Sequence, residues 1–202
     1  MKLTWYKHAC FALESAEGSV VFDPYENGYL PGFTLPQLSA DLCLSSHRHG
    51  DHYAPGAVQL SGKEPAFTVT QLPCFHDEVQ GKKRGGNLIS IVEAEGLRIC
   101  HMGDIGHMLG KEQLMQMGRV DVLLLPVGGV YTVDAKGAKA LADTVSARVI
   151  VPMHYRMGEN GLQNVAPVDD FLALYPDGMI KRLPGASWDV VLPDEPTVLV
   201  FG

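Results

Sequence analysis

Four metal-capable side chains crowd into six consecutive positions of this chain, and this cluster limits the possible folds more than any other feature. They directly follow the apolar run Leu42–Leu44, in the segment His47-Arg48-His49-Gly50-Asp51-His52. In an extended chain, side chains two positions apart share a face, so His47, His49 and Asp51 would point the same way. Gly50 lets the backbone turn, which brings His52 back to that face. Such a cluster at the end of a strand predicts a metal site.

The size and composition indicate one globular domain, residues 1–202. A hydrophobic fraction of 46% and a charged fraction of 19% are those of a folded protein. The formal net charge of -7 argues against a nucleic-acid-binding surface, since the longest basic run is Lys82-Lys83-Arg84. Bound divalent cations would offset part of this negative charge. We therefore expect a small-molecule substrate and no nucleic-acid partner.

The chain carries no recognisable targeting segment. Residues Met1–His8 lack the uninterrupted apolar region and the small-residue cleavage site of a signal peptide. No stretch reaches the roughly 20 apolar residues that span a bilayer. We expect a cytoplasmic protein without a membrane partner; the oligomeric state stays open. The cysteines form no Cys-x-x-Cys pair, and free thiols are expected at Cys10, Cys43, Cys74 and Cys100.

The order of apolar runs predicts a sheet-rich fold with few helices. Strands are expected at residues 3–6, 10–14, 19–23, 42–44, 66–72, 87–93, 98–101, 120–126, 148–154, 179–183, 188–192 and 197–201. Helices are expected at residues 54–60, 111–117, 135–145 and 168–174. Strands come first and then alternate with helices, which favours two β-sheets face to face with helices outside.

Residues 25–36 form a loop rich in glycine and proline that also carries three aromatic side chains, Tyr25, Tyr29 and Phe33. A loop of this composition can form the wall of a pocket. It can equally serve to cover the core with its aromatic rings. The sequence leaves both interpretations open.

Three more metal-capable residues stand where apolar runs end, namely His76, Asp104 and His154. Taken singly, each has an ordinary explanation: a surface histidine, an aspartate in a turn and a hydrogen-bonded core histidine. Together with the central cluster these explanations lose weight, because three strand ends would have to carry such residues by coincidence.

The cluster His47, His49, Asp51 and His52, followed by His76, Asp104 and His154, resembles the signature of the metallo-β-lactamase-fold hydrolases. The resemblance extends over nearly the whole chain. It implies a four-layer αββα sandwich with the metal site along one edge of the sheets. It also implies that His47, His49 and His76 hold one ion, that Asp51, His52 and His154 hold another, and that Asp104 bridges them.

The ligand types indicate the chemistry. Imidazoles and carboxylates without a thiolate suit Zn²⁺ first, with Mn²⁺ and Fe²⁺ as alternatives. Two such cations about 3.5–4 Å apart can share a water molecule and turn it into a bridging hydroxide near neutral pH. We expect Asp51 and Asp104 to be the catalytic carboxylates. Asp51 is the better proton acceptor, because one of its oxygens can stay free while the other binds metal.

Other polar residues are candidates for supporting roles. His8 and His101 could hydrogen-bond metal ligands, and His107 could line the site. The alternative for each is an ordinary core or surface histidine. Lys82, Lys83 and Arg84 follow His76 and Arg156 follows His154, so these residues could form a cationic rim that favours a phosphate or carboxylate on the substrate. The alternative is a set of solvated loop charges.

Within the superfamily, the chain is most similar to the compact bacterial hydrolases related to ascorbate-6-phosphate lactonase, with the segment Pro152-Met153-His154-Tyr155. We therefore expect a dinuclear metal-dependent hydrolase that acts on a small anionic ester or lactone. A phosphodiesterase or nuclease of the same fold is one alternative. A non-catalytic metal-binding module is another, and it would have a closed coordination shell because only catalytic sites keep an open position.

Overall fold

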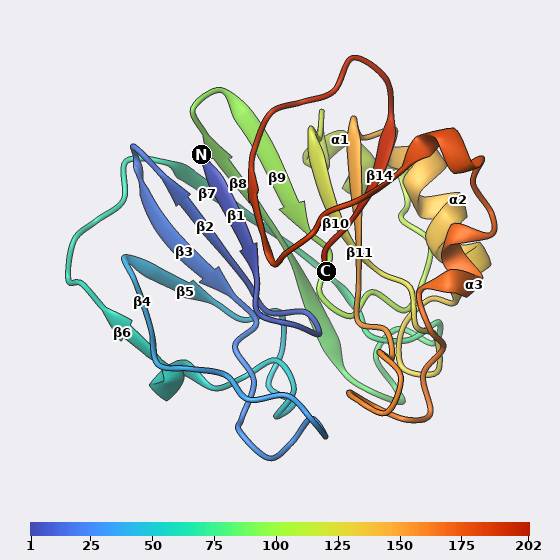
Figure 1. The fold of residues 1–202 in the computed structure, drawn as a ribbon, viewed down its shortest axis with the longest axis horizontal. Coiled ribbons are helices and arrows are strands. Elements are labelled where there is room, and N and C mark those ends of the chain that lie inside the picture. Colours follow the sequence, from blue (N-terminus) through green and yellow to red (C-terminus); the bar gives the residue numbers. More distant parts are fainter.

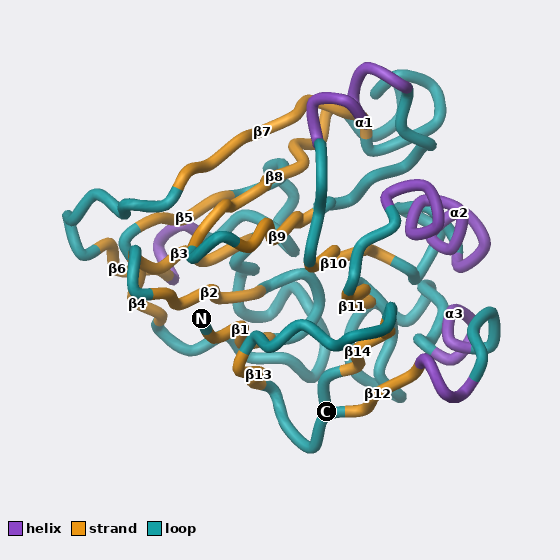
Figure 2. The backbone as a smooth tube through the Cα atoms, turned by 90° about the horizontal axis from the view of Figure 1, so that it is seen from above, coloured by secondary structure: helices purple, strands orange, loops and turns teal.

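The computed structural model describes residues 1–202 and has two β-sheets packed face to face (Figures 1 and 2). The first sheet has the strand order β13-β1-β2-β3-β5, and the second has the order β12-β14-β11-β10-β9-β8-β7. The strands of the first sheet are β1 (Lys2–Trp5), β2 (Phe11–Ser15), β3 (Gly18–Phe22), β5 (Leu42–Leu44) and β13 (Ser187–Asp189). Those of the second are β7 (Thr68–Phe75), β8 (Gly86–Ala94), β9 (Leu97–His101), β10 (Val122–Pro126), β11 (Val149–Met153), β12 (Ile180–Arg182) and β14 (Thr197–Val200).

The facing sides of the two sheets enclose the main core, a cluster of 44 buried residues. Strand β2 shows how the sequence selects this arrangement. Phe11 and Leu13 belong to the main core, whereas Ala12 between them belongs to a second cluster on the outer side. This alternation is the period of two that a strand imposes on its side chains. In β10 all five residues are buried, because helices cover the other face of that strand.

The outer face of the second sheet carries α1 (Lys111–Met117), α2 (Ala135–Val145) and α3 (Asp169–Leu172) (Figure 2). The first two helices have the expected bounds, and α3 is shorter than expected. The fold is the expected one, but no helix covers the outer face of the first sheet. That layer consists of the loop of residues 25–36 and a small two-stranded sheet, β4 (Leu38–Ala40) with β6 (Val58–Leu60).

The expected helix at residues 54–60 is therefore wrong. The chain makes one 3₁₀ turn at Pro55–Ala57 and continues into β6, which pairs in parallel with β4. Pro55 fits a helix start, but Ala54 provides no side-chain cap and Gly56 weakens the turn. Val58 buries its β-branched side chain in the outer cluster instead.

The topology brings several strand ends to one edge. Strands β9, β10 and β11 are parallel, and β7 has the same direction because it pairs antiparallel with β8, which pairs antiparallel with β9. In the first sheet β3 and β5 are parallel. Carboxyl ends of parallel strands meet at the same edge. The loops that follow these strands gather in the lower half of Figure 1.

Two further expectations can be compared with the structure. All four cysteines are free thiols, as expected. None of the helices combines the length and the hydropathy that crossing a membrane requires.

Candidate metal centre

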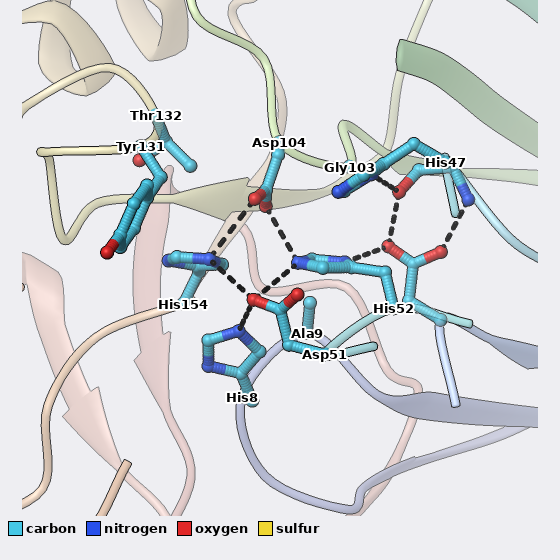
Figure 3. A network of polar contacts seen from close by, with 12 residues as sticks. His8, Ala9, His47, Asp51, His52, Gly103, Asp104, Tyr131, Thr132 and His154 are labelled. Atoms are coloured by element: carbon cyan, nitrogen blue, oxygen red, sulfur yellow. Dashed lines mark hydrogen bonds and ion pairs between the residues drawn. The ribbon is translucent and has the colours of Figure 1, made fainter. Parts of the chain in front are cut away.

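The structure brings together all the residues predicted as metal ligands. The ligand atoms of His47, His49 and His76 lie within 4.8 Å of one another, and so do those of His8, Asp51, His52 and His154. Asp104 lies between these two groups. Its Oδ1 is 3.2 Å from His52 Nε2, and its Oδ2 is 3.2 Å from both His76 Nε2 and His154 Nε2. In Figure 3, Asp104 faces His52 and His154 from one side and Asp51 faces them from the other.

The central motif reaches this geometry as a loop rather than as a continued strand. Strand β5 ends at Leu44, and a turn follows in which His52 N donates to His49 O over 2.9 Å. Gly50 takes part in this turn, as expected, but without a left-handed backbone. A Cβ atom at Gly50 would lie 2.5 Å from the ring of Tyr29. Glycine is required here because Tyr29 packs directly against the motif.

A buried carboxylate that the sequence analysis missed orients two of the histidines. Asp23 is 1% exposed and accepts hydrogen bonds from Ser46 N, Ser46 Oγ and His52 Nδ1 over 2.6, 2.6 and 2.7 Å. His47 Nδ1 in turn donates to Ser46 Oγ over 2.9 Å. Both rings therefore direct Nε2 toward the cluster. Metal-binding histidines commonly make such a hydrogen bond through the ring nitrogen that does not bind the metal. Asp23 directly follows β3, as the other site residues follow their strands, but the sequence analysis included it in the expected strand of residues 19–23.

Asp104 and His76 are positioned by partners that the sequence also did not indicate. Asn87 Oδ1 accepts from Asp104 N over 2.9 Å, and Asn87 Nδ2 donates to Met102 O over 2.9 Å. A Cβ atom at Gly103, whose φ is 55°, would lie 2.3 Å from Asn87 Oδ1. His76 Nδ1 donates to Tyr131 O over 2.9 Å, so its Nε2 is also free for a ligand.

Several buried atoms of the cluster have no hydrogen-bond partner, namely His47 Nε2, His52 Nε2, His154 Nε2 and Asp104 Oδ1. Buried polar atoms nearly always have a hydrogen-bond partner, so a group of unpaired nitrogen and oxygen atoms that face one another indicates a missing partner. Imidazole nitrogens and a carboxylate oxygen are the donor set of a borderline divalent cation. The residues present therefore fit such an ion. His49, by contrast, is exposed, which leaves the centre open on one side.

His8 joins this centre, as one of its two interpretations anticipated. Its ring is buried, and Nε2 lies 3.3 Å from Asp51 Oδ2. Lys7, His8 and His154 have left-handed φ angles of 74°, 53° and 54°. His154 N donates to His8 O over 3.2 Å, which ties these segments together. Left-handed non-glycine residues cost free energy and collect at functional sites, where the surrounding fold enforces them.

The remaining histidines brace the site from outside. His101 is buried, donates from Nε2 to Ala9 O over 2.9 Å and accepts from Gly103 N at Nδ1 over 3.1 Å. It thus supports the turn that carries Asp104. His107 accepts from Phe75 N over 3.1 Å, next to His76, but it does not line the pocket above the cluster.

The pocket above the cluster corrects the expected cationic rim. It has a volume of about 260 Å³ and is lined by Tyr29, His49, Asp51, His76, Lys83, Arg84, Asp104, Tyr131 and Leu162. Lys83 and Arg84 are present, but Lys82 is not. Arg156 lies in a different hollow and donates to Val165 O and Gly158 O. Lys82 and Lys83 are neighbours in the loop, and the sequence alone does not fix which of the two lines the pocket.

A family model for the β-lactamase superfamily domain matches residues 2–154 of this chain. The chain belongs to the β-lactamase superfamily. A metal-dependent hydrolase of Archaeoglobus fulgidus is 30% identical over an alignment of 195 positions, and the match covers 77% of this chain and 83% of the relative. One of Methanoculleus marisnigri is 30% identical over 190 residues, covering 77% and 81% of the two chains.

Solved structures agree with this assignment. A crystal structure from Thermotoga maritima, described as a candidate zinc-dependent hydrolase of the metallo-β-lactamase superfamily, has a TM-score of 0.78 and 34% identity, and the match covers 99% of this chain and 97% of that one. A candidate metal-dependent hydrolase from Parabacteroides distasonis, at 22% identity and a TM-score of 0.64 over 87% and 88% of the chains, shows the same fold. The chain is thus a metal-dependent hydrolase with the metallo-β-lactamase fold, as its motif predicted.

Without a bound ion, the two halves of the candidate metal centre differ in the protonation of their histidines. Burial and the neighbouring His52 lower the pKa of His47 to about 3, and burial also lowers the pKa of His49. Burial opposes charge on His154 as well, but Asp104 and Asp51 raise its pKa to about 9. The pKa of His52 is raised well above its usual value, because the carboxylates of Asp104 and Asp23 together outweigh the effect of burial.

We expect cation binding to release protons, and to release them from one half of the centre. At pH 7, His47 and His49 offer unprotonated nitrogens, whereas His52 and His154 carry protons that a cation must displace. For each displaced proton, affinity falls about tenfold per pH unit below the raised pKa. The half with His52 and His154 should therefore lose its ion first on acidification.

Calorimetric titration with Zn²⁺, in two buffers of different ionisation enthalpy at pH 6 and pH 8, measures this proton release. A total binding enthalpy that does not depend on the buffer at either pH would contradict the assignment of protons to His52 and His154.

Proposed function

We propose that this hydrolase uses two divalent cations, with zinc the first choice and Mn²⁺ or Fe²⁺ as alternatives, to hydrolyse a small anionic ester or lactone in the cytoplasm. One observation carries the proposal: two groups of ligand atoms, each within 4.8 Å, lie on either side of Asp104. His47, His49 and His76 would hold one ion. Asp51, His52 and His154 would hold the other, with Asp104 between them.

When bound, the two cations supply a water molecule of lowered pKa and polarise the oxygen of the bond under attack. The chain's own residues keep the geometry. Asp23 and Ser46 direct the Nε2 atoms of His52 and His47 inward, and Asn87 fixes the backbone of Asp104. Asp51 has an Oδ1 atom that accepts no hydrogen bond, while its Oδ2 faces His8. That free oxygen can take the proton released by the attacking water.

The pocket supports a small substrate. Its volume of about 260 Å³ is below the range typical of drug-sized ligands, which supports a compact substrate. The pocket also opens directly onto His49, Asp51 and Asp104, which favours an enzyme over a closed metal-binding module. The four free cysteines agree with the reducing conditions of a cytoplasm.

The metal content of the protein tests this proposal. Protein stripped with a chelator and reconstituted with Zn²⁺ or Mn²⁺ should contain about two ions per chain by elemental analysis. His49→Ala removes a ligand of one ion only, so about one ion should remain and turnover of a panel of esters and lactones should be lost. Lys82→Ala, which changes an exposed side chain outside the pocket, should behave like the unmodified protein.

Two outcomes would sink the dinuclear proposal. One is a reconstituted protein that holds a single ion. The other is a His49→Ala variant that hydrolyses the esters and lactones as fast as Lys82→Ala does.

A further inference from the structure

The Arg84 guanidinium faces the pocket without an acidic partner. Its Nη2 donates to Val130 O over 2.8 Å, whereas Nε and Nη1 donate to no protein acceptor. An arginine carries five N–H groups, and Nε and Nη1 account for three of them. Arg84 is partly buried and lines the same cavity as Asp51 and Asp104, yet it forms an ion pair with neither carboxylate. A fork of unpaired N–H groups in a pocket is suited to a carboxylate or phosphate.

The loop that carries Arg84 is organised by one buried carboxylate. Asp77, which is 1% exposed, accepts from Val79 N and Gly81 N at Oδ1 and from Lys83 N and Arg84 N at Oδ2, over 2.8 to 2.9 Å. Although burial opposes its charge, these backbone N–H groups lower the pKa of Asp77 to about 2. The loop is therefore held in one shape next to His76, and Arg84 keeps a fixed position relative to the metal ligands.

A second loop fixes the guanidinium from the opposite side. Val130 adopts a φ of 62°, which is strained for a β-branched residue, and its carbonyl accepts from Arg84. The guanidinium carbon lies 5.8 Å from the centre of the Tyr131 ring, within the range of a cation–π contact. Tyr131 OH accepts from Asn164 Nδ2 over 2.7 Å. Arg84 thus joins two loops of the pocket and has little freedom to leave it.

Lys83 is held less firmly. It pairs with Glu78, and the two side chains are 55% and 60% exposed. A pair this exposed contributes little, so Lys83 is free to turn toward a ligand but is not positioned for one. Tyr29, Tyr131 and Leu162 line the same pocket as the two cationic residues and the metal ligands, and they present apolar surface to the body of a substrate.

We propose that Arg84, assisted by Lys83, binds an anionic group at the end of the substrate remote from the scissile bond, while Tyr29 and Tyr131 enclose a flat or apolar body between that group and the metal centre. This inference rests on the proposed function and narrows its substrate class. The ligand chemistry is a carboxylate or a phosphate, both of which match the guanidinium fork.

Equilibrium binding tests the subsite without turnover. Benzoate and phenylphosphonate are titrated calorimetrically into the zinc-loaded protein, one probe for each anion. Arg84→Ala should weaken binding of the preferred anion about 10- to 100-fold, the loss of a charge-assisted pair. The affinity of Arg84→Lys should lie between those of the unmodified protein and Arg84→Ala, because lysine keeps the positive charge but lacks the planar guanidinium. Lys83→Ala should cost about threefold at most, and Lys82→Ala, the matched control outside the pocket, nothing.

A pair of esters links the subsite to catalysis. Mono-4-nitrophenyl glutarate carries a terminal carboxylate, and 4-nitrophenyl pentanoate does not. Arg84→Ala should raise KM for the glutarate ester by a larger factor than KM for the pentanoate ester. Asp77→Asn, a change to a positioning residue, should do the same in milder form, because an amide cannot accept from all four backbone N–H groups.

Equal affinity of Arg84→Ala and Lys82→Ala for both anions, or no binding of either probe to the unmodified protein, would overturn the subsite. The two proposals fail differently. If neither ester is hydrolysed but the affinity for an anion still depends on Arg84, the proposed function fails and the subsite stands. If both esters are hydrolysed with no dependence on Arg84, the hydrolase stands and the subsite fails.

Discussion

The Asp104→Asn variant is expected to lose turnover by about 10³-fold or more while it keeps its fold. Asp104 is the one side chain within 3.2 Å of histidines from both halves of the centre. Its Oδ2 faces one histidine of each half, His76 and His154, and its Oδ1 faces His52. An amide offers one oxygen and a neutral charge in the same volume. A neutral amide oxygen attracts cations far less than a carboxylate oxygen does, so the pair of ions should no longer be held together.

The fold should survive this change because the position of residue 104 depends on its backbone. Asn87 accepts from the backbone N–H of Asp104, a contact that the substitution leaves in place. Asp169→Asn is the matched control, since Asp169 is an exposed carboxylate on α3 that pairs only with Arg182. The measurement is the turnover of reconstituted protein on its best ester or lactone, beside elemental analysis and circular dichroism. Turnover within tenfold of the control would contradict the bridging role.

The predicted metal ligands were recoverable from the sequence because of a simple relation between strands and polar residues. His76, Asp104 and His154 each stand just after an apolar run, and parallel strands place their carboxyl ends at one edge. The length and apolar character of these runs were enough to place the residues, even where the strand bounds differ by up to three residues. Local patterns therefore determined most of the ligand set.

What the sequence concealed depends on contacts between distant segments. Asp23 and His52 are 29 positions apart, and Asp104 and Asn87 are 17 apart, so no local period relates them. The same holds for Tyr131, which meets His76 across 55 positions. Loop geometry was equally out of reach: Lys83 lines the pocket and Lys82 does not, although the two are neighbours in the sequence.

The loop of residues 25–36 shows a further limit of prediction from the sequence, because it both forms a wall of the pocket and covers the core. Tyr25 and Phe33 are buried in the outer cluster, as a cover of the core requires. Tyr29, four positions after Tyr25, lines the pocket and packs against Gly50. Composition indicates that such a loop has aromatic contacts to make, but the direction of each ring depends on the segment that it meets.

Asp23→Asn tests a residue that orients a metal ligand without being one itself. We expect this variant to weaken zinc binding about 10- to 100-fold. The carboxylate accepts from Ser46 N with one oxygen and from Ser46 Oγ and His52 Nδ1 with the other. An amide has one oxygen and one NH₂ group, so in either orientation a donor faces a donor. One orientation opposes Nδ1–H of His52 and favours the tautomer with its proton on Nε2, the atom that must bind the ion.

The other orientation spares His52 but leaves Ser46 N without an acceptor in the core, which costs about 1–3 kcal/mol. Competition with a fluorescent chelator measures the affinity, and urea unfolding of the metal-free protein measures the stability. Asp41→Asn is the matched control: Asp41 also accepts from a backbone N–H and a hydroxyl, those of Ser19, but it is not among the ligands or the pocket residues. It should lose stability without losing zinc affinity. If both variants bind zinc as tightly as the unmodified protein, Asp23 has no part in orienting His52, and the tautomer must be set by the ion alone.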